Sequence, residues 1–272
     1  MIEHCLAEKE KRLTLELKKY ISLMVAFSGG VDSTYLLYAA HQVLGESLVA
    51  ATAVSDIHPE REIDSAREFA CNTGIRHIFV QTGQLVSVEF IQNSQDRCYV
   101  CKKHMFAALF REAKKLGVQY VAHGANLDDD KDFRPGLKAA REMTVAAPLA
   151  DAGLTKRDIR ALSRKAGLPT WDKPASGCLA TRVPYGTEIT QEVLQLIDKA
   201  EQVLLDAGFS GCRVRYHGPL AKIEVPEVDL ARIVMPEIRS KIVEQLRRVG
   251  FLYVALDLEG CQSGRLNRPL QA

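Results

Sequence analysis

Residues 24–37 read MVAFSGGVDSTYLL, and the turn at their centre decides the fold. The apolar run before the turn predicts a buried strand over Leu23–Phe27, and a helix is predicted from Asp32 to Leu44. Two adjacent glycines let the backbone turn tightly and approach a ligand without interference from a Cβ atom. The peptide N–H groups of the turn then lie at a helix N-terminus, where the dipole favours an anion. The sequence therefore predicts a phosphate-binding turn.

The side chains of this turn add to its anion chemistry. Ser28 and Ser33 offer hydroxyl donors, and Asp32 can cap the helix or hold a metal ion. The turn lacks the lysine of a Walker A loop, so it is not the usual cradle of a γ-phosphate. SGGxDS instead resembles the PP-loop of the ATP pyrophosphatase superfamily, whose members split ATP into AMP and pyrophosphate. A glycine-rich turn with no ligand is the structural alternative.

Composition and charge exclude several classes of protein. The 272 residues suffice for two unequal domains, and a formal net charge of +2 gives no broad basic surface for nucleic acid. The N-terminal residues do not resemble a signal peptide, and no apolar run approaches the ~18 residues of a membrane span. We therefore expect a cytoplasmic protein with no membrane partner and no stable nucleic-acid partner.

Strand-like runs alternate with helical stretches through the first two-thirds of the chain. This alternation predicts an α/β fold, a doubly wound and mostly parallel sheet. Ligands of such sheets bind outside the carboxyl ends of the strands. We therefore expect residues 123–129 (HGANLDD), after a later strand, to face the same crevice as the glycine-rich turn. The other predicted strands are Leu48–Val54, His77–Val80, Tyr120–His123 and Val145–Pro148, with helices over 59–73, 102–116 and 135–142.

The last third of the chain predicts a smaller C-terminal α+β domain. Thr155 and Asp158 resemble a capping box, which starts the last helix of the first domain. The stretch 167–190 then lacks periodicity, which in a compact protein indicates a functional segment. We expect a PP-loop ATP pyrophosphatase domain over 1–185 and an α+β substrate-binding or oligomerisation domain over 186–272. Helices are predicted over 190–207 and 236–248, with strands over 213–216, 222–225 and 251–256.

Seven cysteines with uneven spacing argue against a disulfide framework. Cys98 and Cys101 form a CxxC pair before a predicted helix, and the adjacent lysines 102 and 103 favour ionised thiols. Four interpretations stay open: a redox dithiol, half of a zinc site, two structural thiols, or three thiolates that include Cys178. Three cysteines around a 4Fe–4S cluster leave one iron open to substrate or exogenous sulfur.

Cys178 lies in the irregular segment DKPASGCLATRVPY, residues 172–185. Basic Lys173 and Arg182 and two flanking prolines predict a held, electropositive position, which suits a reactive or ligating thiolate. The other cysteines are interpreted as small core residues (Cys5, Cys71 and Cys212) or as incidental (Cys261).

Three stretches together resemble the LarE family of ATP-dependent sulfur transferases. They are SGGVDS at 28–33, HGANLDD followed by DFRPG within 123–136, and PASGCLATRVPYG at 174–186. The resemblance covers essentially the whole chain. It implies a role in making the nickel-pincer nucleotide cofactor of lactate racemase. Family members adenylate the carboxylates of pyridinium-3,5-dicarboxylic acid mononucleotide and convert them to thiocarboxylates.

The resemblance also implies cofactors and partners. One branch of the family sacrifices the cysteine that matches Cys178. This chain is similar to the branch in which Cys98, Cys101 and Cys178 hold a 4Fe–4S cluster that carries the transferable sulfide. ATP and Mg²⁺ are the other expected cofactors. A small-molecule nucleotide substrate and a sulfur donor are the expected partners, and a homo-oligomer is expected.

Catalytic roles are expected for Cys178 and Asp32. Arg213 and Arg215 lie on one face of a predicted strand, where two guanidinium groups suit a phosphate, although a solvated face explains the spacing equally well. The resemblance favours the substrate's phosphate and adds Arg182 and Glu201 to the substrate site. The nucleotide site is expected to comprise Phe27, Ser28, Gly29, Gly30, Val31, Asp32, Ser33, Val54, Gly124 and Asn126.

Three other functions compete with this interpretation. A PP-loop tRNA thiolase with an Fe–S cluster predicts a basic face or an RNA-binding module, and the sequence suggests neither. An ammonia-using ligase shares the PP-loop but needs no cysteine triad. A nucleotide sensor would bind ATP without releasing pyrophosphate.

Overall fold

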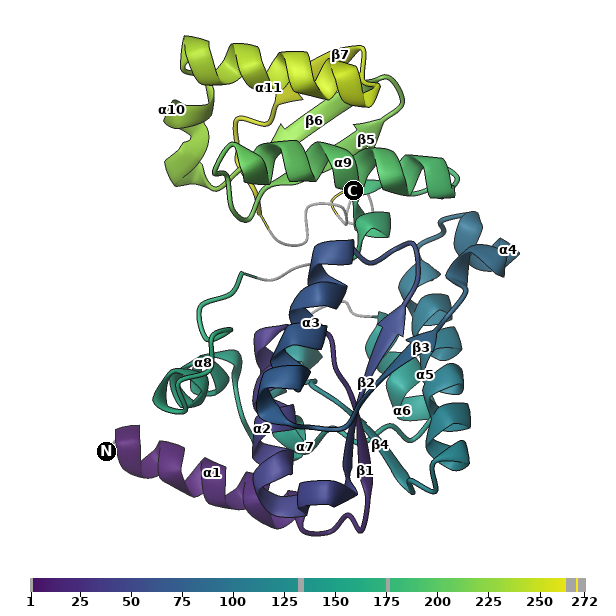
Figure 1. Cartoon of the computed structure of the whole chain (residues 1–272), viewed down its shortest axis with the longest axis vertical. Helices are drawn as coiled ribbons and strands as arrows, with labels where there is room; N and C mark the ends of the chain where they lie inside the picture. The colour runs from purple at the N-terminus through teal and green to yellow at the C-terminus, as the bar shows by residue number, and fades with distance from the viewer. Residues whose placement is uncertain (1, 132–134, 175–176, 263–267, 269–272) are drawn as a thin grey trace. The chain divides into compact units, whose positions relative to one another are not determined.

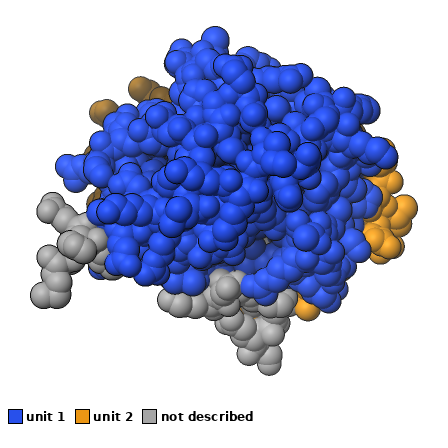
Figure 2. All heavy atoms as spheres, turned by 90° about the horizontal axis from the view of Figure 1, so that it is seen from below, with its two compact units in different colours: residues 1–84, 96–173 blue, residues 85–95, 174–272 orange. Residues whose placement is uncertain are grey.

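The computed structural model describes residues 2–131, 135–174, 177–262 and 268. The chain forms two compact units, coloured separately in Figure 2. Unit 1 comprises residues 1–84 and 96–173, and unit 2 comprises residues 85–95 and 174–272. Within the described ranges, no helix has both the length and the apolar character that crossing a membrane requires.

Unit 1 is built on a four-stranded parallel sheet with the strand order β3-β2-β1-β4 (Figure 1). The strands are β1 (Leu23–Ala26), β2 (Leu48–Val54), β3 (His77–Gln81) and β4 (Tyr120–His123). The chain runs outward from β1 through β2 to β3 and then returns to place β4 on the other side of β1. This reversal makes the carboxyl ends of β1 and β4 the switch point where ligands of such sheets bind. The predicted α/β fold is confirmed.

Helices cover both faces of this sheet because successive strand residues point to opposite sides. Leu23 and Val25 of β1 enter one core with α1, α2 and α8, whereas Met24 enters the other with α5 and α6. The helices of unit 1 are α1 (Ile2–Leu17), α2 (Val31–Leu44), α3 (Glu60–Thr73), α5 (Arg97–Lys115), α6 (Pro135–Glu142), α7 (Pro148–Asp151) and α8 (Lys156–Lys165), with 3₁₀ turns η1 (Gly45–Ser47) and η3 (Leu127–Lys131).

The predicted strand over Val145–Pro148 is wrong. Only Ala146 pairs with the sheet, through an isolated bridge to Ala122. Pro148 instead begins α7. A proline has no N–H to donate to a sheet, but its fixed φ suits the first turn of a helix. The apolar run therefore continues into a helix.

Unit 2 is an α+β fold with a three-stranded sheet of order β5-β6-β7, in which β5 and β6 are antiparallel and β6 and β7 are parallel. One buried cluster between this sheet and its helices forms the core. The predicted smaller α+β fold is confirmed. Its elements are α4 (Val88–Ile91), η4 (Leu179–Arg182), α9 (Gln191–Asp206), β5 (Arg213–His217), β6 (Leu220–Glu224), η5 (Glu227–Asp229), α10 (Leu230–Ile233), α11 (Pro236–Val249) and β7 (Tyr253–Leu256), and η2 (Gln84–Val86) joins the units.

The division into units differs from a boundary after residue 185, because a short earlier segment belongs with unit 2. The buried Asn93 amide donates hydrogen bonds to the carbonyls of Pro184 and Thr187, at 2.7 and 2.8 Å. The Asn93 carbonyl accepts a third from the Gly186 amide at 3.1 Å. One buried side chain thus ties residues 85–95 to a segment ninety positions away, a link that local sequence patterns do not reveal.

Candidate active site

The glycine-rich turn follows β1 directly and opens α2, as predicted. The Phe27 amide still donates to the Ala51 carbonyl, at 2.9 Å, so the chain leaves the sheet only after this residue. Gly29 has a φ of +67°, which a residue with a side chain rarely adopts. Gly30 occupies the N-cap position, where no side chain caps the first turn of α2. The amides of that turn are therefore left to a ligand or water.

The two serines of the turn have different roles. The exposed Ser28 hydroxyl and the buried Ser33 hydroxyl lie 3.0 Å apart. Ser33 Oγ also accepts from the Ser28 amide at 3.2 Å and lies 3.2 Å from the Gly30 carbonyl, to which it donates. Ser33 therefore fixes the shape of the turn, and the Ser28 side chain faces solvent.

The loop after β4 packs directly against the first turn of α2. A Cβ atom on Gly124 would lie 2.9 Å from the Ser33 nitrogen, so only glycine allows this approach. Asn126, which is 3% exposed, closes the loop by accepting from the Asp128 amide at 3.0 Å. The structure thus brings Gly124 to the glycine-rich turn as expected, and half-buried Val54 ends β2 at the same edge of the sheet.

Two lysines that sequence reasoning did not assign to this site reach the glycine-rich turn. Lys156, at the start of α8, places its ammonium 2.6 Å from Asp32 Oδ2. Its main-chain amide donates to Asp128 at 2.9 Å, which fixes the helix start beside the HGANLDD loop. Lys173 donates to the Gly29 carbonyl at 3.1 Å and pairs with Glu62 at 2.7 Å. A loop without its own lysine therefore receives two ammonium groups from distant parts of the chain.

The confirmed capping box explains where Lys156 lies. The Thr155 side chain accepts from the Asp158 amide, and the Asp158 carboxylate accepts from the Thr155 amide at 3.0 Å. Lys9 pairs with the same carboxylate at 2.6 Å. This pattern marks the helix start in the sequence, but only the fold brings the next residue to Asp32.

Cys98 and Cys101 occupy the first two turns of α5. Residues three apart share a helix face, and both thiols are half-buried. A Cβ atom on Gly136 would lie 2.9 Å from the Lys102 side chain and 3.6 Å from the Cys98 carbonyl, so α6 packs closely on this part of the helix.

Two histidines relate the start of α5 to the ligand-binding edge of the sheet. Burial, reinforced by the Lys102 charge, lowers the pKa of His58 and of His123 to about 4. His58 follows β2 and His123 ends β4, so Lys102 lies near the carboxyl ends of both strands. Both histidines are neutral at neutral pH, whereas Lys102 carries a positive charge.

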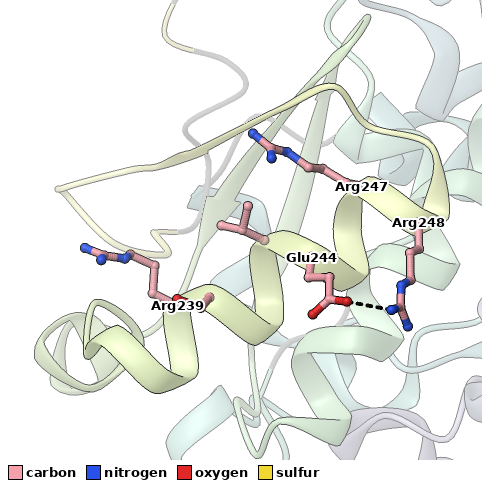
Figure 3. Close-up of a pocket in the computed structure, with 6 residues that line it drawn as sticks. Arg239, Glu244, Arg247 and Arg248 are labelled. Atoms are coloured by element: carbon pink, nitrogen blue, oxygen red, sulfur yellow. Dashed lines mark hydrogen bonds and ion pairs between the residues drawn. The ribbon is translucent and has the colours of Figure 1, made fainter.

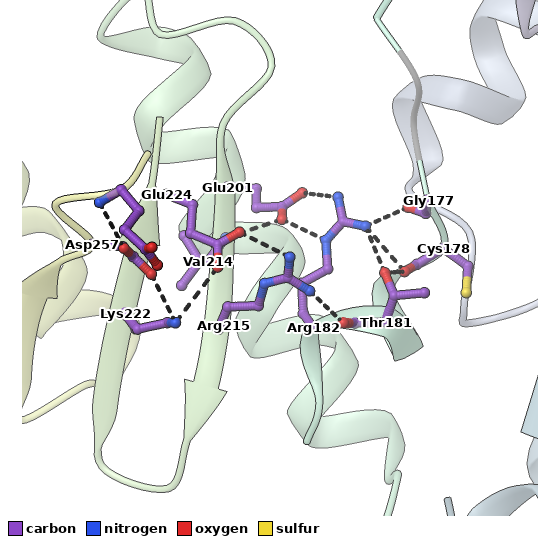
Figure 4. Close-up of polar contacts among 11 residues, drawn as sticks. Gly177, Cys178, Thr181, Arg182, Glu201, Val214, Arg215, Lys222, Glu224 and Asp257 are labelled. Atoms are coloured by element: carbon purple, nitrogen blue, oxygen red, sulfur yellow. Dashed lines mark hydrogen bonds and ion pairs between the residues drawn. The ribbon is translucent and has the colours of Figure 1, made fainter. Parts of the chain in front are cut away.

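In unit 2, the main chain of Cys178 is held by three donors (Figure 4). The Cys178 carbonyl accepts from the Thr181 amide at 3.0 Å, the Thr181 hydroxyl at 2.7 Å and the Arg182 guanidinium at 3.1 Å. The same guanidinium donates to the Gly177 carbonyl at 2.5 Å. The sulfur atom of the half-buried Cys178 points away from this network.

The predicted substrate residues Arg182, Glu201 and Arg215 belong to a buried ion-pair network. Arg182 and Glu201 pair at 2.8 Å with only 3% and 1% of their surfaces exposed. Burial alone would lower the pKa of Arg182, but the paired Glu201 carboxylate outweighs it and the pKa is raised. Arg215 pairs with Glu224 at 2.8 Å and donates to the Thr181 carbonyl at 2.7 Å.

Arg213, on the same strand as Arg215, is half-buried. Burial is the main cause that lowers the pKa of Arg213, and the charges of Arg182 and Arg215 lower it further against the opposing Cys261 and Glu224. With the Lys222–Asp257 pair at 3.0 Å, this cluster holds four cationic and three anionic side chains. Arg213 thus lies beside the guanidinium groups of Arg182 and Arg215.

The cysteine predictions have mixed outcomes. Cys212 is buried as expected, but Cys71 is exposed, because α3 buries only the face that carries Ala66 and Ala70. Within the part of the chain that the structure describes, no three His, Cys, Asp or Glu side chains form a metal-binding group. Cys98 and Cys101 belong to unit 1 and Cys178 to unit 2, so their joint role stays a prediction. The Cys5 side chain and the motif residues 132–134 and 175–176 lie outside the described residues.

A shallow hollow of about 620 Å³ lies along α11 (Figure 3). Arg239, Arg247 and Arg248 line it, and Arg248 pairs with Glu244. None of the predicted site residues lines this hollow, so it is separate from the chemistry described above.

Comparison with known proteins identifies the family. No protein-family model matches the chain. It is 36% identical to the pyridinium-3,5-bisthiocarboxylic acid mononucleotide synthase of Lactiplantibacillus plantarum over 266 residues, 97% of this chain and 96% of that protein. An uncharacterized Synechocystis protein is 43% identical over 91% of this chain and 92% of its own length. A tRNA-specific 2-thiouridylase of Desulforamulus reducens is 28% identical over 57% of this chain and 53% of its own. With its glycine-rich turn at the switch point of a parallel sheet, the chain belongs to the LarE family of sulfur transferases, within the PP-loop ATP pyrophosphatase superfamily.

Proposed function

We propose that the protein converts the carboxylates of pyridinium-3,5-dicarboxylic acid mononucleotide to thiocarboxylates, with cleavage of ATP to AMP and pyrophosphate. The observation that carries this proposal is the uncapped glycine-rich turn at the switch point of unit 1. The similarity of the whole chain to a synthase of the corresponding bisthiocarboxylic acid mononucleotide suggests the substrate class.

The first half-reaction activates the substrate. A carboxylate oxygen attacks the α-phosphorus of ATP, the bond from that phosphorus to the bridging oxygen breaks, and pyrophosphate leaves. The N-terminus of α2 binds the leaving group, and Lys156 and Lys173 neutralise its charge. Asp32 fits a Mg²⁺ ligand, since its carboxylate lies in the turn beside the phosphate position. The product is an acyl-adenylate.

The second half-reaction replaces AMP with sulfur at the acyl carbon. Cys98, Cys101 and Cys178 would hold a 4Fe–4S cluster, which when bound supplies sulfide to the substrate. Three thiolates suit a cluster with one open iron, and two of them share a face of α5 beside Lys102. Sacrifice of the Cys178 sulfur is the alternative route.

The Arg213 region is the proposed site for the substrate's phosphate. This arginine is less buried than Arg182 and Arg215 and lies within the field of both charges. A phosphate there would offset the mutual repulsion of the three guanidinium groups.

The test is an anaerobic assay with ATP, Mg²⁺, sulfide and the dicarboxylate mononucleotide, which measures pyrophosphate and, by mass spectrometry, the thiocarboxylate. Both products should form over many turnovers. Asp32→Asn should abolish both, whereas Asp64→Asn, which changes an exposed carboxylate on α3, should not. Pyrophosphate without a sulfur-containing product would overturn the proposed function.

Iron analysis separates the two sulfur routes. Cys98→Ser should lower iron and acid-labile sulfide and stop multiple turnover, whereas Cys71→Ser, which alters an exposed thiol, should retain both. Unchanged turnover without iron would exclude the cluster. A single turnover accompanied by loss of the Cys178 sulfur would identify the sacrificial route.

A tRNA thiolase is the second candidate, because the chain is similar to a tRNA-specific 2-thiouridylase. That function requires salt-sensitive binding of tRNA and thiolated nucleosides after incubation with ATP and sulfide. Both are measurable with the same preparation.

A further inference from the structure

The chain segment that carries Cys178 is held through its main chain by a buried guanidinium. Arg182 donates from Nη1 to the carbonyls of Gly177 and Cys178, and from Nε and Nη2 to the Glu201 carboxylate. Glu201 is fixed in turn, because its Oε1 accepts from the Val214 amide at 3.1 Å. Strand β5 and helix α9 therefore set the position of the thiol-bearing segment.

We propose that Arg182 and Glu201 are positioning residues for Cys178 and make no direct contact with the substrate. Figure 4 shows the Cys178 carbonyl directed into the network and the sulfur directed away from it. Fixing the peptides on both sides of the Cys178 Cα sets the direction in which the thiol projects.

The hydrogen-bonding capacity of Arg182 favours this role over substrate binding. A guanidinium has five N–H groups, and Glu201 and the two carbonyls engage four of them. The residue is only 3% exposed. A substrate phosphate that displaced the Glu201 carboxylate would break a buried ion pair, which is unfavourable.

Thr181 completes the clamp and offers a milder test. Its hydroxyl donates to the Cys178 carbonyl at 2.7 Å and accepts from Arg182 at 3.0 Å, while its carbonyl accepts from Arg215. Thr181→Val removes the hydroxyl with little change of shape and no change of charge.

This inference rests on the proposed function only for its activity readout, and the first measurement needs no reaction. In the full-length protein without ATP, substrate or cluster, the rate of Cys178 alkylation by iodoacetamide is followed by peptide mass spectrometry. Thr181→Val should raise this rate about fivefold, the equivalent of one lost hydrogen bond. The double variant Arg182→Met with Glu201→Gln should raise the alkylation rate further. The conservative variant Arg182→Lys should give a rate between those of the wild type and the double variant.

The matched control is Arg232→Met. Arg232 also pairs with an acid, Asp229, and donates to a main-chain carbonyl, that of Gly208 at 2.6 Å, but does not contact the Cys178 segment. This variant should alkylate at the wild-type rate.

The activity readout separates positioning from substrate binding. Thr181→Val and Arg182→Lys should lower kcat for thiocarboxylate formation, by up to about 100-fold for a misplaced thiol, with a substrate KM within threefold of wild type. A raised KM with unchanged alkylation would make Arg182 a substrate ligand and overturn the inference. Equal effects in the Arg232→Met control would also overturn it. If the wild-type protein made no thiocarboxylate, the proposed function would fail while the alkylation rates still decided the role of Arg182.

Discussion

The positive charge at the glycine-rich turn comes from lysines outside it. Lys156 and Asp32 lie 124 positions apart, yet their charged groups are 2.6 Å from one another. Both are partly exposed, so their direct attraction contributes little to stability. Under the proposed function, Asp32 keeps the Lys156 ammonium beside the phosphate position, where a polyphosphate would interact with it more strongly than a single carboxylate does.

Lys156→Met should therefore raise the KM for ATP about fivefold to tenfold, the loss expected for one charge-assisted phosphate contact. Initial rates of pyrophosphate release against ATP concentration measure this. Lys165→Met, at the other end of the same helix, removes an exposed ion pair with Glu10 and should leave the KM unchanged. Equal KM values in all three proteins would remove Lys156 from the site.

At Gly124, the absence of a Cβ atom allows the loop after β4 to pack against the first turn of α2. Gly124→Ala would place a Cβ atom 2.9 Å from the Ser33 nitrogen, so the HGANLDD loop must move away from α2. We expect a loss of about 1–3 kcal/mol in the free energy of unfolding and a larger loss of ATP binding. Gly117→Ala is the control, since it strains a left-handed backbone at φ +70° in open space. It should destabilise the protein without affecting ATP binding, measured by calorimetry.

At the scale of elements, the carboxyl edge of the parallel sheet holds two half-buried, neutral histidines. The pKa of His58 and of His123 is lowered to about 4, whereas an unfolded histidine titrates near 6.5. Between these values the unfolded chain binds more protons, so the free energy of unfolding decreases as the pH falls from about 6.5 to 4.

Urea unfolding at pH 7 and pH 5 should show this decrease, of a few kcal/mol at most. His123→Gln should reduce the difference between the two pH values by about 1–2 kcal/mol. His104→Gln changes an exposed side chain on α5 and should leave the difference unchanged. A pH dependence that persists in full in His123→Gln would contradict the burial of this neutral ring.

Features formed by residues that are close in the chain can be predicted from the sequence, whereas contacts between distant residues cannot. The strand, glycine-rich turn and α2 are adjacent in the chain, and so are Thr155 and Asp158, so their patterns predict the structure directly. The approach of Lys156 to Asp32 and the anchoring of the 85–95 segment by Asn93 depend on pairs about ninety or more positions apart. Arg182 shows a different limit. An arginine four positions after Cys178 indicates a candidate site, but the sequence does not show that Glu201 neutralises its charge.

For the whole molecule, the proposed function draws its two half-reactions from residues of different units. The glycine-rich turn with its lysines belongs to unit 1, and Cys178 belongs to unit 2. Cys178→Ala should therefore retain substrate-dependent pyrophosphate release within about threefold while thiocarboxylate falls by at least about 100-fold. Coupled pyrophosphate and thiocarboxylate assays on one preparation measure the ratio. Loss of both products together would show that adenylation requires the thiol.

Lys173 anchors the end of unit 1 to the glycine-rich turn. It is the last residue of unit 1, its ammonium is anchored to Gly29 and Glu62, and five positions later the chain reaches Cys178. An incoming triphosphate would compete with Glu62 for that ammonium, so filling the turn would exchange one partner of Lys173 for another.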